Sequence, residues 1–256
     1  MRQDILGYGV NTLAIDQCVD DIFRRLRGEE NPQRRCAWLA CLNPHSYVVA
    51  VDDPLFSVAL KDADWLVPDG AGVVMASQLL GRRVAERVTG SDVFIGLCER
   101  MNSAGGMSVF FLGATEDTLD RIRARMANDY PGIRIAGTYS PPFRPIYSNE
   151  EIDAMINAIN TVRPDVLWVG MTAPKQEKWI YANRDRLQVR FAGAVGAVFD
   201  FYAGRVKRSH PVFQRLGLEW LPRLIQQPRR LWRRMFVSAP IFVWHVCKEK
   251  VRSASR

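Results

Sequence analysis

The sequence has few cysteines and histidines, and neither residue type is grouped. Five cysteines stand among 256 residues, none of them in a Cys-x-x-Cys pair, and the three histidines are dispersed. An odd number of scattered cysteines argues against a disulfide framework and against a zinc site. We therefore expect a reducing compartment, no bound metal and no cofactor.

Long apolar runs are also missing. Residues 1–16 have a short apolar stretch flanked by charges, without the apolar core and cleavage site of a signal peptide, so we expect no secretion. The uncharged stretch at 235–247 is shorter than the ~20 residues that a spanning helix needs, and Pro240 interrupts it. We predict that this stretch lies on a bilayer without crossing it.

Three common catalytic and nucleotide-binding motifs are absent. The chain has no Gly-x-Ser-x-Gly, no Walker A sequence and no Gly-x-Gly-x-x-Gly after a predicted strand. The missing glycine fingerprint argues against a nucleotide-dependent oxidoreductase on a Rossmann-like sheet. That activity stays open as an alternative.

Positive charge is in excess and is concentrated near the carboxyl end. A net charge of +8 predicts an anionic partner, such as nucleic acid, lipid headgroups or a pyrophosphate. Tryptophan, leucine and phenylalanine interleave with the arginines there, which favours an interfacial helix and a membrane surface over nucleic acid. A solvated helix face and a non-enzymatic basic module, binding membranes or nucleic acid, both stay open. The arginines are Arg223, Arg229, Arg230, Arg233, Arg234 and Arg252.

Short apolar runs alternate with amphipathic stretches along the chain, as they do in βαβ units. The predicted strands cover residues 5–10, 37–42, 65–67, 108–112, 134–138, 165–169 and 190–202. The predicted helices cover residues 16–27, 44–60, 72–80 and 149–162, and others start near Thr115, at Pro174 and at Ser91 as the N-cap.

This pattern predicts the α/β class, with a Rossmann-like parallel sheet, helices on both faces and a basic helical C-terminal appendage. The composition changes near residue 216, and we place the boundary between about 206 and 216. The predicted domains are a core of residues 1–210 and a membrane-docking appendage of residues 211–256.

In an open parallel sheet, ligands bind beyond the carboxyl ends of the strands. Each glycine at such an end is also compatible with a simple tight turn. Together they predict one rim for a site. The residues at predicted strand ends are Asn43, Asp69, Gly70, Gly113, Gly170 and Asp200.

Charged and amide side chains near this rim suit group transfer. Asp69 follows an apolar run, so its carboxylate is placed to act as a general base, although Asp-Gly is also a common turn. Lys175 and Gln176 follow Pro174 in the first turn of a predicted helix, where both side chains can face a leaving diphosphate. Arg87 is the other internal cation expected near the cleft. Lys175 and Arg87 are equally compatible with surface charges.

These residues stand in segments that resemble the bacterial glycosyltransferase family 26, the WecG/TagA/CpsF family. The segments occur in the family's order and cover nearly the whole chain. They are VPDG at 67–70, RVTGSD at 87–92, FFLG at 110–113, PKQE at 174–177, AVGAVFDFYAG at 194–204, GLEWLPRL at 217–224 and PRR at 228–230.

The resemblance implies a UDP-sugar donor, an undecaprenyl-diphosphate-linked saccharide acceptor, inversion at the anomeric carbon and no essential metal. It implies that Asp69 is the base and that Gln176 and Arg87 contact substrate or leaving group. It further implies that arginines of the appendage close over the diphosphate and dock the enzyme on the membrane, at the cytoplasmic face of the bacterial inner membrane. These arginines are Arg223, Arg230 and Arg233.

Two details qualify the resemblance. Many relatives carry a threonine shortly before the asparagine that matches Asn43, whereas this chain has Cys41 and Leu42. The Asn-Pro-His-Ser sequence at 43–46 is more similar to the exopolysaccharide branch, which includes xanthan-type glucosyltransferases, than to the N-acetylmannosamine branch. Glucose, N-acetylmannosamine and its uronic acid all stay open as the donor sugar, as does a homo-oligomer.

A DxD triplet, which many metal-dependent glycosyltransferases use to hold a divalent ion, is present at Asp62 and Asp64. It precedes the apolar run at 65–67 and therefore falls at the entry end of that predicted strand. We expect it to lie away from the site.

Overall fold

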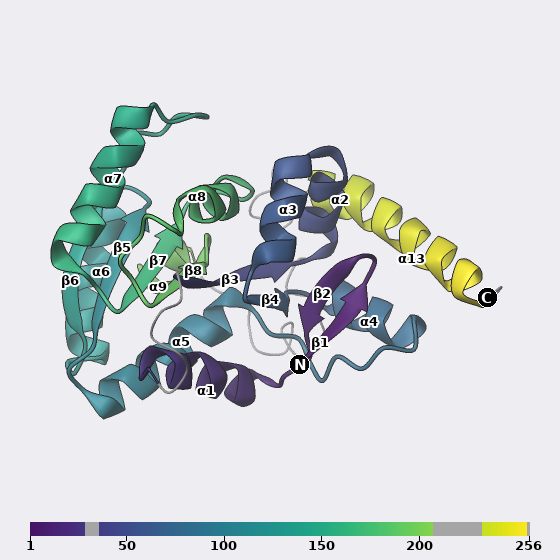
Figure 1. Ribbon diagram of the computed structural model, residues 1–256, viewed down its shortest axis with the longest axis horizontal. Helices are drawn as coiled ribbons and strands as arrows, with labels where there is room; N and C mark the ends of the chain where they lie inside the picture. The colour runs from purple at the N-terminus through teal and green to yellow at the C-terminus, as the bar shows by residue number, and fades with distance from the viewer. Residues whose placement is uncertain (29–35, 207–231, 255–256) are drawn as a thin grey trace.

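The computed structural model describes residues 1–28, 36–206 and 232–254. Six strands form one parallel sheet in the order β4-β3-β8-β7-β5-β6 (Figure 1). The predicted α/β class and its Rossmann-like parallel sheet are confirmed. The strands are β3 (Ala37–Leu42), β4 (Trp65–Pro68), β5 (Ser108–Gly113), β6 (Arg134–Tyr139), β7 (Val166–Gly170) and β8 (Phe191–Ala194).

Helices cover both faces of the sheet, because successive side chains of each strand point to opposite faces. In β3, Trp38, Ala40 and Leu42 enter one buried cluster, and Ala37 and Leu39 enter the other. The first cluster is covered by α2 (Pro44–Asp52), α3 (Pro54–Asp62), α4 (Ala71–Leu79), α7 (Asn149–Val162), α8 (Lys175–Asn183) and α13 (Ala239–Ala254). The second is covered by α1 (Ile15–Leu26), α5 (Gly90–Ala104), α6 (Glu116–Asp129) and α9 (Val198–Tyr202).

Two predicted elements of the first half are each divided. The strand predicted at 5–10 is a hairpin of β1 (Arg2–Ile5) and β2 (Tyr8–Asn11), because Leu6 and Gly7 turn the chain at positive φ. The helix predicted at 44–60 is two helices. Asp53 ends α2 and caps α3, where its carboxylate accepts the Phe56 N–H at 3.0 Å, and Pro54 follows.

Two other predictions place an element boundary wrongly. The strand predicted at 190–202 ends at Ala194, and the chain turns at Gly196 into α9. The N-cap of α5 is Thr89 and not Ser91. Thr89 Oγ1 accepts the Asp92 N–H at 3.2 Å, and the Asp92 carboxylate accepts the Thr89 N–H at 3.0 Å.

The C-terminal helix packs on α2. A π-helical turn, η1 (Arg234–Ser238), leads into α13, and Pro240 lies in the first turn of α13, where its missing N–H leaves the helix intact. The Phe242 ring is buried and lies edge-on to Tyr47, with ring centres 5.3 Å apart. His45 and His245 add side-chain hydrogen bonds, to Ser238 Oγ at 2.9 Å and to Tyr47 Oη at 2.8 Å.

The helical part of the predicted appendage is therefore present and docked. None of the helices in the described ranges combines the length and apolar character needed to cross a bilayer. The predicted domain boundary, between 206 and 216, falls outside the described residues, so the division at residue 210 stays a prediction.

Phe242→Ala tests how α13 is held. Loss of a buried phenylalanine costs about 3 kcal/mol or more, so the variant should release α13 while the sheet stays folded. Amide hydrogen exchange should become faster across 239–250 and stay unchanged in β3 and β5. Val243→Ala is the matched control, because Val243 is 55% exposed. Equal exchange in both variants would show that Phe242 does not anchor the helix.

Candidate functional site

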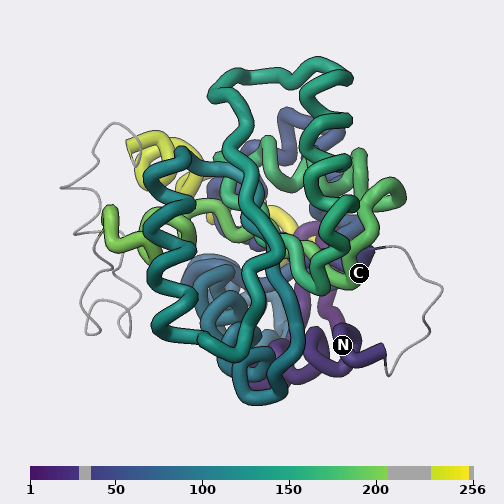
Figure 2. The backbone as a smooth tube through the Cα atoms, turned by 90° about the vertical axis from the view of Figure 1, so that its left-hand side faces the viewer, coloured from purple at the N-terminus to yellow at the C-terminus, as the bar shows by residue number. Residues whose placement is uncertain are grey.

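A cavity of about 890 Å³ opens at the carboxyl edge of the sheet. Its walls come from the segments that follow β3, β4, β5, β7 and β8, and from the loop at 140–147 after β6. That loop projects from the body of the molecule, as the teal segment leading into α7 in Figure 2. The rim predicted from the sequence is thus a continuous hollow in the structure.

Glycine is required where the strand ends approach their neighbours. A Cβ at Gly113 would lie 2.5 Å from the Gly170 carbonyl oxygen, and a Cβ at Gly170 would lie 2.3 Å from the Phe199 ring. Neither distance can be tolerated, and Gly113 also has φ +117°. The two glycines therefore serve packing at the base of the cavity.

The structure brings most of the predicted site residues together. The cavity is lined by Asn43, Asp69, Gly113, Gly170, Lys175, Gln176 and Asp200. Gly70, Arg87 and Arg233 are not among the lining residues. Gly70 caps α4 directly after Asp69, and Arg87 precedes Val88, whose N–H donates to the Pro68 carbonyl at the end of β4. Arg223 and Arg230 lie outside the described residues, and their predicted roles stay predictions.

Asp69 is held at the cavity wall by its neighbours on β3. Its N–H donates to the Leu42 carbonyl at 2.8 Å, which continues the pairing of β3 and β4. Asn43 caps α2 through Oδ1, which accepts the Ser46 N–H at 2.9 Å. The cap therefore turns Asn43 Nδ2 toward Asp69, whose Oδ2 lies 3.5 Å away. The carboxylate is partly exposed and faces the hollow as a hydrogen-bond acceptor.

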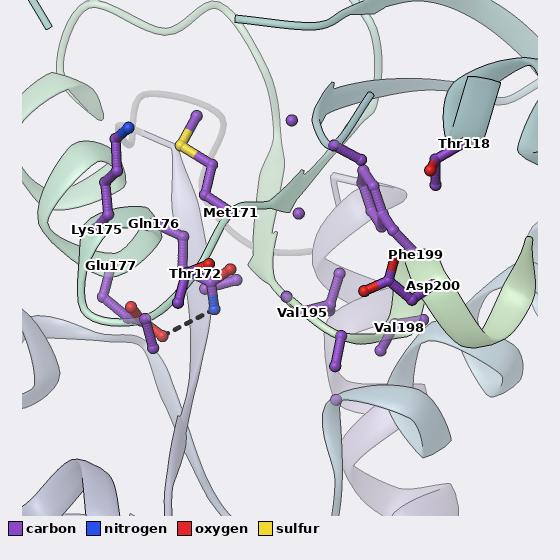
Figure 3. Close-up of a pocket in the computed structure, with 18 of the residues that line it drawn as sticks. Thr118, Met171, Thr172, Lys175, Gln176, Glu177, Val195, Val198, Phe199 and Asp200 are labelled. Atoms are coloured by element: carbon purple, nitrogen blue, oxygen red, sulfur yellow. Dashed lines mark hydrogen bonds between the residues drawn. The ribbon is translucent and has the colours of Figure 1, made fainter. Parts of the chain in front are cut away.

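Lys175 is tied to the wall of the cavity. Its ammonium group donates to the Arg144 carbonyl and lies 3.6 Å from the centre of the Tyr147 ring. Burial lowers the pKa of Lys175. Figure 3 shows its side chain extending away from those of Gln176 and Glu177. In this structure Lys175 thus fastens the loop at 140–147, and its predicted contact with a diphosphate stays a prediction.

Gln176 and Glu177 form a buried polar pair in the first turn of α8. Gln176 is 5% exposed and Glu177 is 2% exposed, and Gln176 Nε2 donates to Glu177 Oε1 at 2.9 Å (Figure 3). Burial raises the pKa of Glu177 to about 7. The sequence analysis did not select Glu177, since a glutamate in the first turn of a helix is ordinarily a solvated, dipole-stabilising residue.

Two arginines that the sequence analysis did not assign to the site also line the cavity. Arg205 Nη1 donates to Thr118 Oγ1 at 2.7 Å and to Thr115 Oγ1 at 3.1 Å, at the N-terminus of α6. Arg234 reaches the cavity from η1. Burial, followed by Arg234 and Arg233, lowers the pKa of His45 to about 4, which places both guanidinium groups near the start of α2.

The carboxylates of the described ranges do not gather into a metal site. No group of three or more His, Cys, Asp and Glu side chains there has the arrangement of a cation site. The DxD carboxylates serve structure at the amino end of β4: Asp62 pairs with Arg184 and accepts the Trp38 indole N–H, and Asp64 accepts the Trp38 backbone N–H at 3.0 Å. A role for a metal stays untested.

Comparison with known proteins gives a consistent result. Residues 3–256 match the profile of the family described as Glycosyl transferase WecG/TagA/CpsF family. An N-acetylglucosaminyldiphosphoundecaprenol N-acetyl-beta-D-mannosaminyltransferase of Bacillus spizizenii is 35% identical over 222 residues, which is 87% of this chain and 83% of the relative. The Staphylococcus aureus (strain MW2) protein of the same name is 28% identical over 249 residues, 97% of this chain and 93% of the relative.

Glu177→Gln tests the burial of this carboxyl group through pH. The pKa rises from 4.5 to about 7 on folding, so the wild-type free energy of unfolding should fall as pH rises from about 4.5 to about 7. Glutamine keeps the acceptor for Gln176 and removes the ionisation. The variant should be more stable by about 3 kcal/mol at pH 8 and by under about 1 kcal/mol at pH 5 in denaturant titrations.

Glu99→Gln is the matched control, because Glu99 is exposed on α5. It should show no gain that depends on pH. A gain for Glu177→Gln of the same size at both pH values would contradict the burial of Glu177.

Proposed function

The chain belongs to the WecG/TagA/CpsF family of glycosyl transferases, and on this premise we propose that it moves a hexose from a UDP-sugar to an undecaprenyl-diphosphate-linked saccharide. The transfer inverts the anomeric carbon and needs no metal. The observation that carries the proposal is the position of Asp69, held by Asn43 on the wall of a cavity that arginines also line. Family membership decides against the oxidoreductase and the non-enzymatic basic module.

Asp69 serves as the general base in this proposal. As the acceptor hydroxyl oxygen attacks the anomeric carbon, its proton passes to the Asp69 carboxylate and the bond from that carbon to the UDP oxygen breaks. Attack from the face opposite UDP inverts the configuration. The Asp69 carboxylate, which Asn43 Nδ2 contacts at 3.5 Å, is the group that receives the proton in this proposal.

Cationic side chains stabilise the departing diphosphate. Arg205, which follows α9, and Arg234, the first residue of η1, both line the cavity. Guanidinium groups bind phosphate oxygens in paired, charge-assisted hydrogen bonds, and a fixed charge inside a cavity acts more strongly than one in open water. These groups supply the charge that a metal ion provides in DxD-type transferases.

The C-terminal helix is the proposed membrane contact. Trp232, Phe236 and Trp244 are each more than half exposed, and Lys248, Lys250 and Arg252 follow along α13. Aromatic and basic side chains on one exposed helix suit the surface of an anionic bilayer. The enzyme therefore sits at the cytoplasmic face of the inner membrane, where its lipid-linked acceptor is accessible.

The donor sugar is proposed at the level of a UDP-hexose. The curated relatives are named as N-acetylmannosaminyltransferases. The Asn-Pro-His-Ser segment at 43–46 resembles the exopolysaccharide glucosyltransferase branch instead. UDP-N-acetylmannosamine, its uronic acid form and UDP-glucose are therefore the donors to compare.

Release of UDP in the presence of a short lipid-diphosphate saccharide tests the function. The wild type should release UDP from one donor of this panel, and only when acceptor is present. Asp69→Asn should lower kcat at least about 100-fold, since the amide cannot take the proton. Asp52→Asn is the control, because Asp52 is an exposed carboxylate at the end of α2.

Undiminished turnover in folded Asp69→Asn would remove Asp69 from the role of base. Absence of acceptor-dependent UDP release for every donor would contradict the proposed reaction.

Arg234→Ala and Arg233→Ala form a matched pair. Arg234 lines the cavity, whereas Arg233 is exposed and outside its lining. We expect Arg234→Ala to weaken UDP binding about tenfold and Arg233→Ala to change it by less than roughly twofold, measured by calorimetry. The reverse order would support the clamp role that the sequence analysis assigned to Arg233.

A further inference from the structure

The pair formed by Gln176 and Glu177 leaves two buried oxygens without a hydrogen bond. Neither Gln176 Oε1 nor Glu177 Oε2 has a partner among the described residues, although both residues are more than nine-tenths buried. Buried polar atoms are nearly always paired, because an unpaired one loses its hydrogen bonds to water and gains nothing in return. Both residues belong to the cavity wall, and their two unpaired oxygens are covered by other protein atoms, so a bound molecule could supply the missing partners after a small shift of these side chains.

Glu177 determines which way the Gln176 amide faces. Above its pKa of about 7 Glu177 is a carboxylate that only accepts hydrogen bonds, so in that state the amide nitrogen is the atom that faces Glu177 Oε1, at 2.9 Å. The amide oxygen is then directed elsewhere. It lies beside Gly196, where an added Cβ would be 3.2 Å from Oε1. The two unpaired oxygens of the pair are therefore acceptors just beneath the cavity wall.

Acceptors of this kind suit a hydroxyl group and not a phosphate. The oxygens of a diphosphate carry negative charge and have no hydrogen to donate, so they would be repelled by Gln176 Oε1 and by Glu177 Oε2 in its ionised state, above the pKa of about 7. A sugar ring presents several O–H donors. In this structure the Gln176 amide nitrogen faces Glu177, and the expected contact of Gln176 with a leaving diphosphate stays a prediction.

We propose that Glu177 is a recognition residue for the transferred sugar: its Oε1 fixes the Gln176 amide, and its Oε2 accepts a hydrogen bond from a ring hydroxyl group, beside Gln176 Oε1. This inference rests on the proposed function, because it takes a UDP-sugar as the molecule in the cavity. It adds a sugar-binding subsite on α8 to the base on β4.

The surroundings of Glu177 agree with this role. Burial, followed by Asp69 and Glu177, raises the pKa of the Cys41 thiol at the end of β3, so both carboxyl groups lie within electrostatic range of Cys41. Asp69 and Glu177 thus act on the same part of the cavity.

Calorimetric titration with UDP and with the accepted UDP-sugar tests the proposal. Glu177→Met keeps the length of the side chain and removes both oxygens. It should bind the UDP-sugar about tenfold more weakly and UDP within twofold of the wild type. Glu177→Gln should lose threefold or less, because the amide still accepts from Gln176 and can donate to the hydroxyl group. Glu99→Met is the exposed control.

Analogues of the accepted sugar that each lack one hydroxyl group identify the contact. The wild type should bind one analogue about tenfold more weakly than the complete UDP-sugar. Glu177→Met should bind that analogue and the complete UDP-sugar with the same affinity. A purely structural role for Glu177 would not produce this pattern. It would also predict lower stability for Glu177→Met, whereas removal of a buried carboxylate should raise the melting temperature at pH 8.

Three results would overturn the proposal. If Glu177→Met weakens the binding of UDP and of the UDP-sugar equally, the Gln176–Glu177 pair contacts the nucleotide or the diphosphate and not the sugar. If Glu177→Met binds both UDP and the UDP-sugar as tightly as the wild type does, Glu177 does not contact the sugar. The same conclusion follows if each loss of affinity caused by removing a hydroxyl group from the sugar is as large in Glu177→Met as in the wild type. Failure of the wild type to bind any UDP-sugar would instead contradict the proposed function itself.

Discussion

The direction of the strands is the constraint on which the site depends. Hydrogen bonding in parallel register makes all six strands end at one edge, so residues far apart in the sequence meet there. Asn43 and Asp69 follow adjacent strands, and Gln176 follows β7 through the first turn of α8. Because β8 lies between β3 and β7, its end at Ala194 closes the wall between these groups. Reversal of any of these strands would move its residue to the far edge.

The same arrangement couples the site to the C-terminal helix. Asn43 caps α2 and also contacts Asp69, while Tyr47 on the next turn of α2 packs against Phe242 of α13. One short helix thus links the proposed base to the proposed membrane contact. Arg234, which starts η1, reaches the cavity from this docked segment. If α13 contacts the bilayer as proposed, its docking on α2 would set the position of the cavity relative to the membrane surface.

Local patterns in the sequence predicted the sheet and the acid on its rim, and long-range contacts explain what they missed. The strand at 37–42 was predicted correctly because its buried run ends at a helix-capping asparagine. Pro54 could have revealed the break between α2 and α3. Arg205, by contrast, meets Thr118 across 87 positions of sequence.

The burial of Glu177 has no local signal either. The glutamate stands in a helix turn that looks solvated, and only the packing of α8 on the sheet removes it from water. In the structure, Gln176 therefore forms a pair with Glu177, and this pair has two oxygens without a hydrogen bond among the described residues. The cation at Lys175 was selected for its position, and its contacts with Arg144 and Tyr147 became apparent only from the fold.

A crystal structure of the protein with a non-reactive analogue of its UDP-sugar is the most direct test of this account. We expect the diphosphate beside Arg234, a ring hydroxyl group within hydrogen-bond distance of Glu177, and the face of the anomeric carbon opposite UDP directed toward Asp69. An analogue bound away from the carboxyl edge of the sheet, or bound there with Asp69 on the same side of the sugar as UDP, would contradict it.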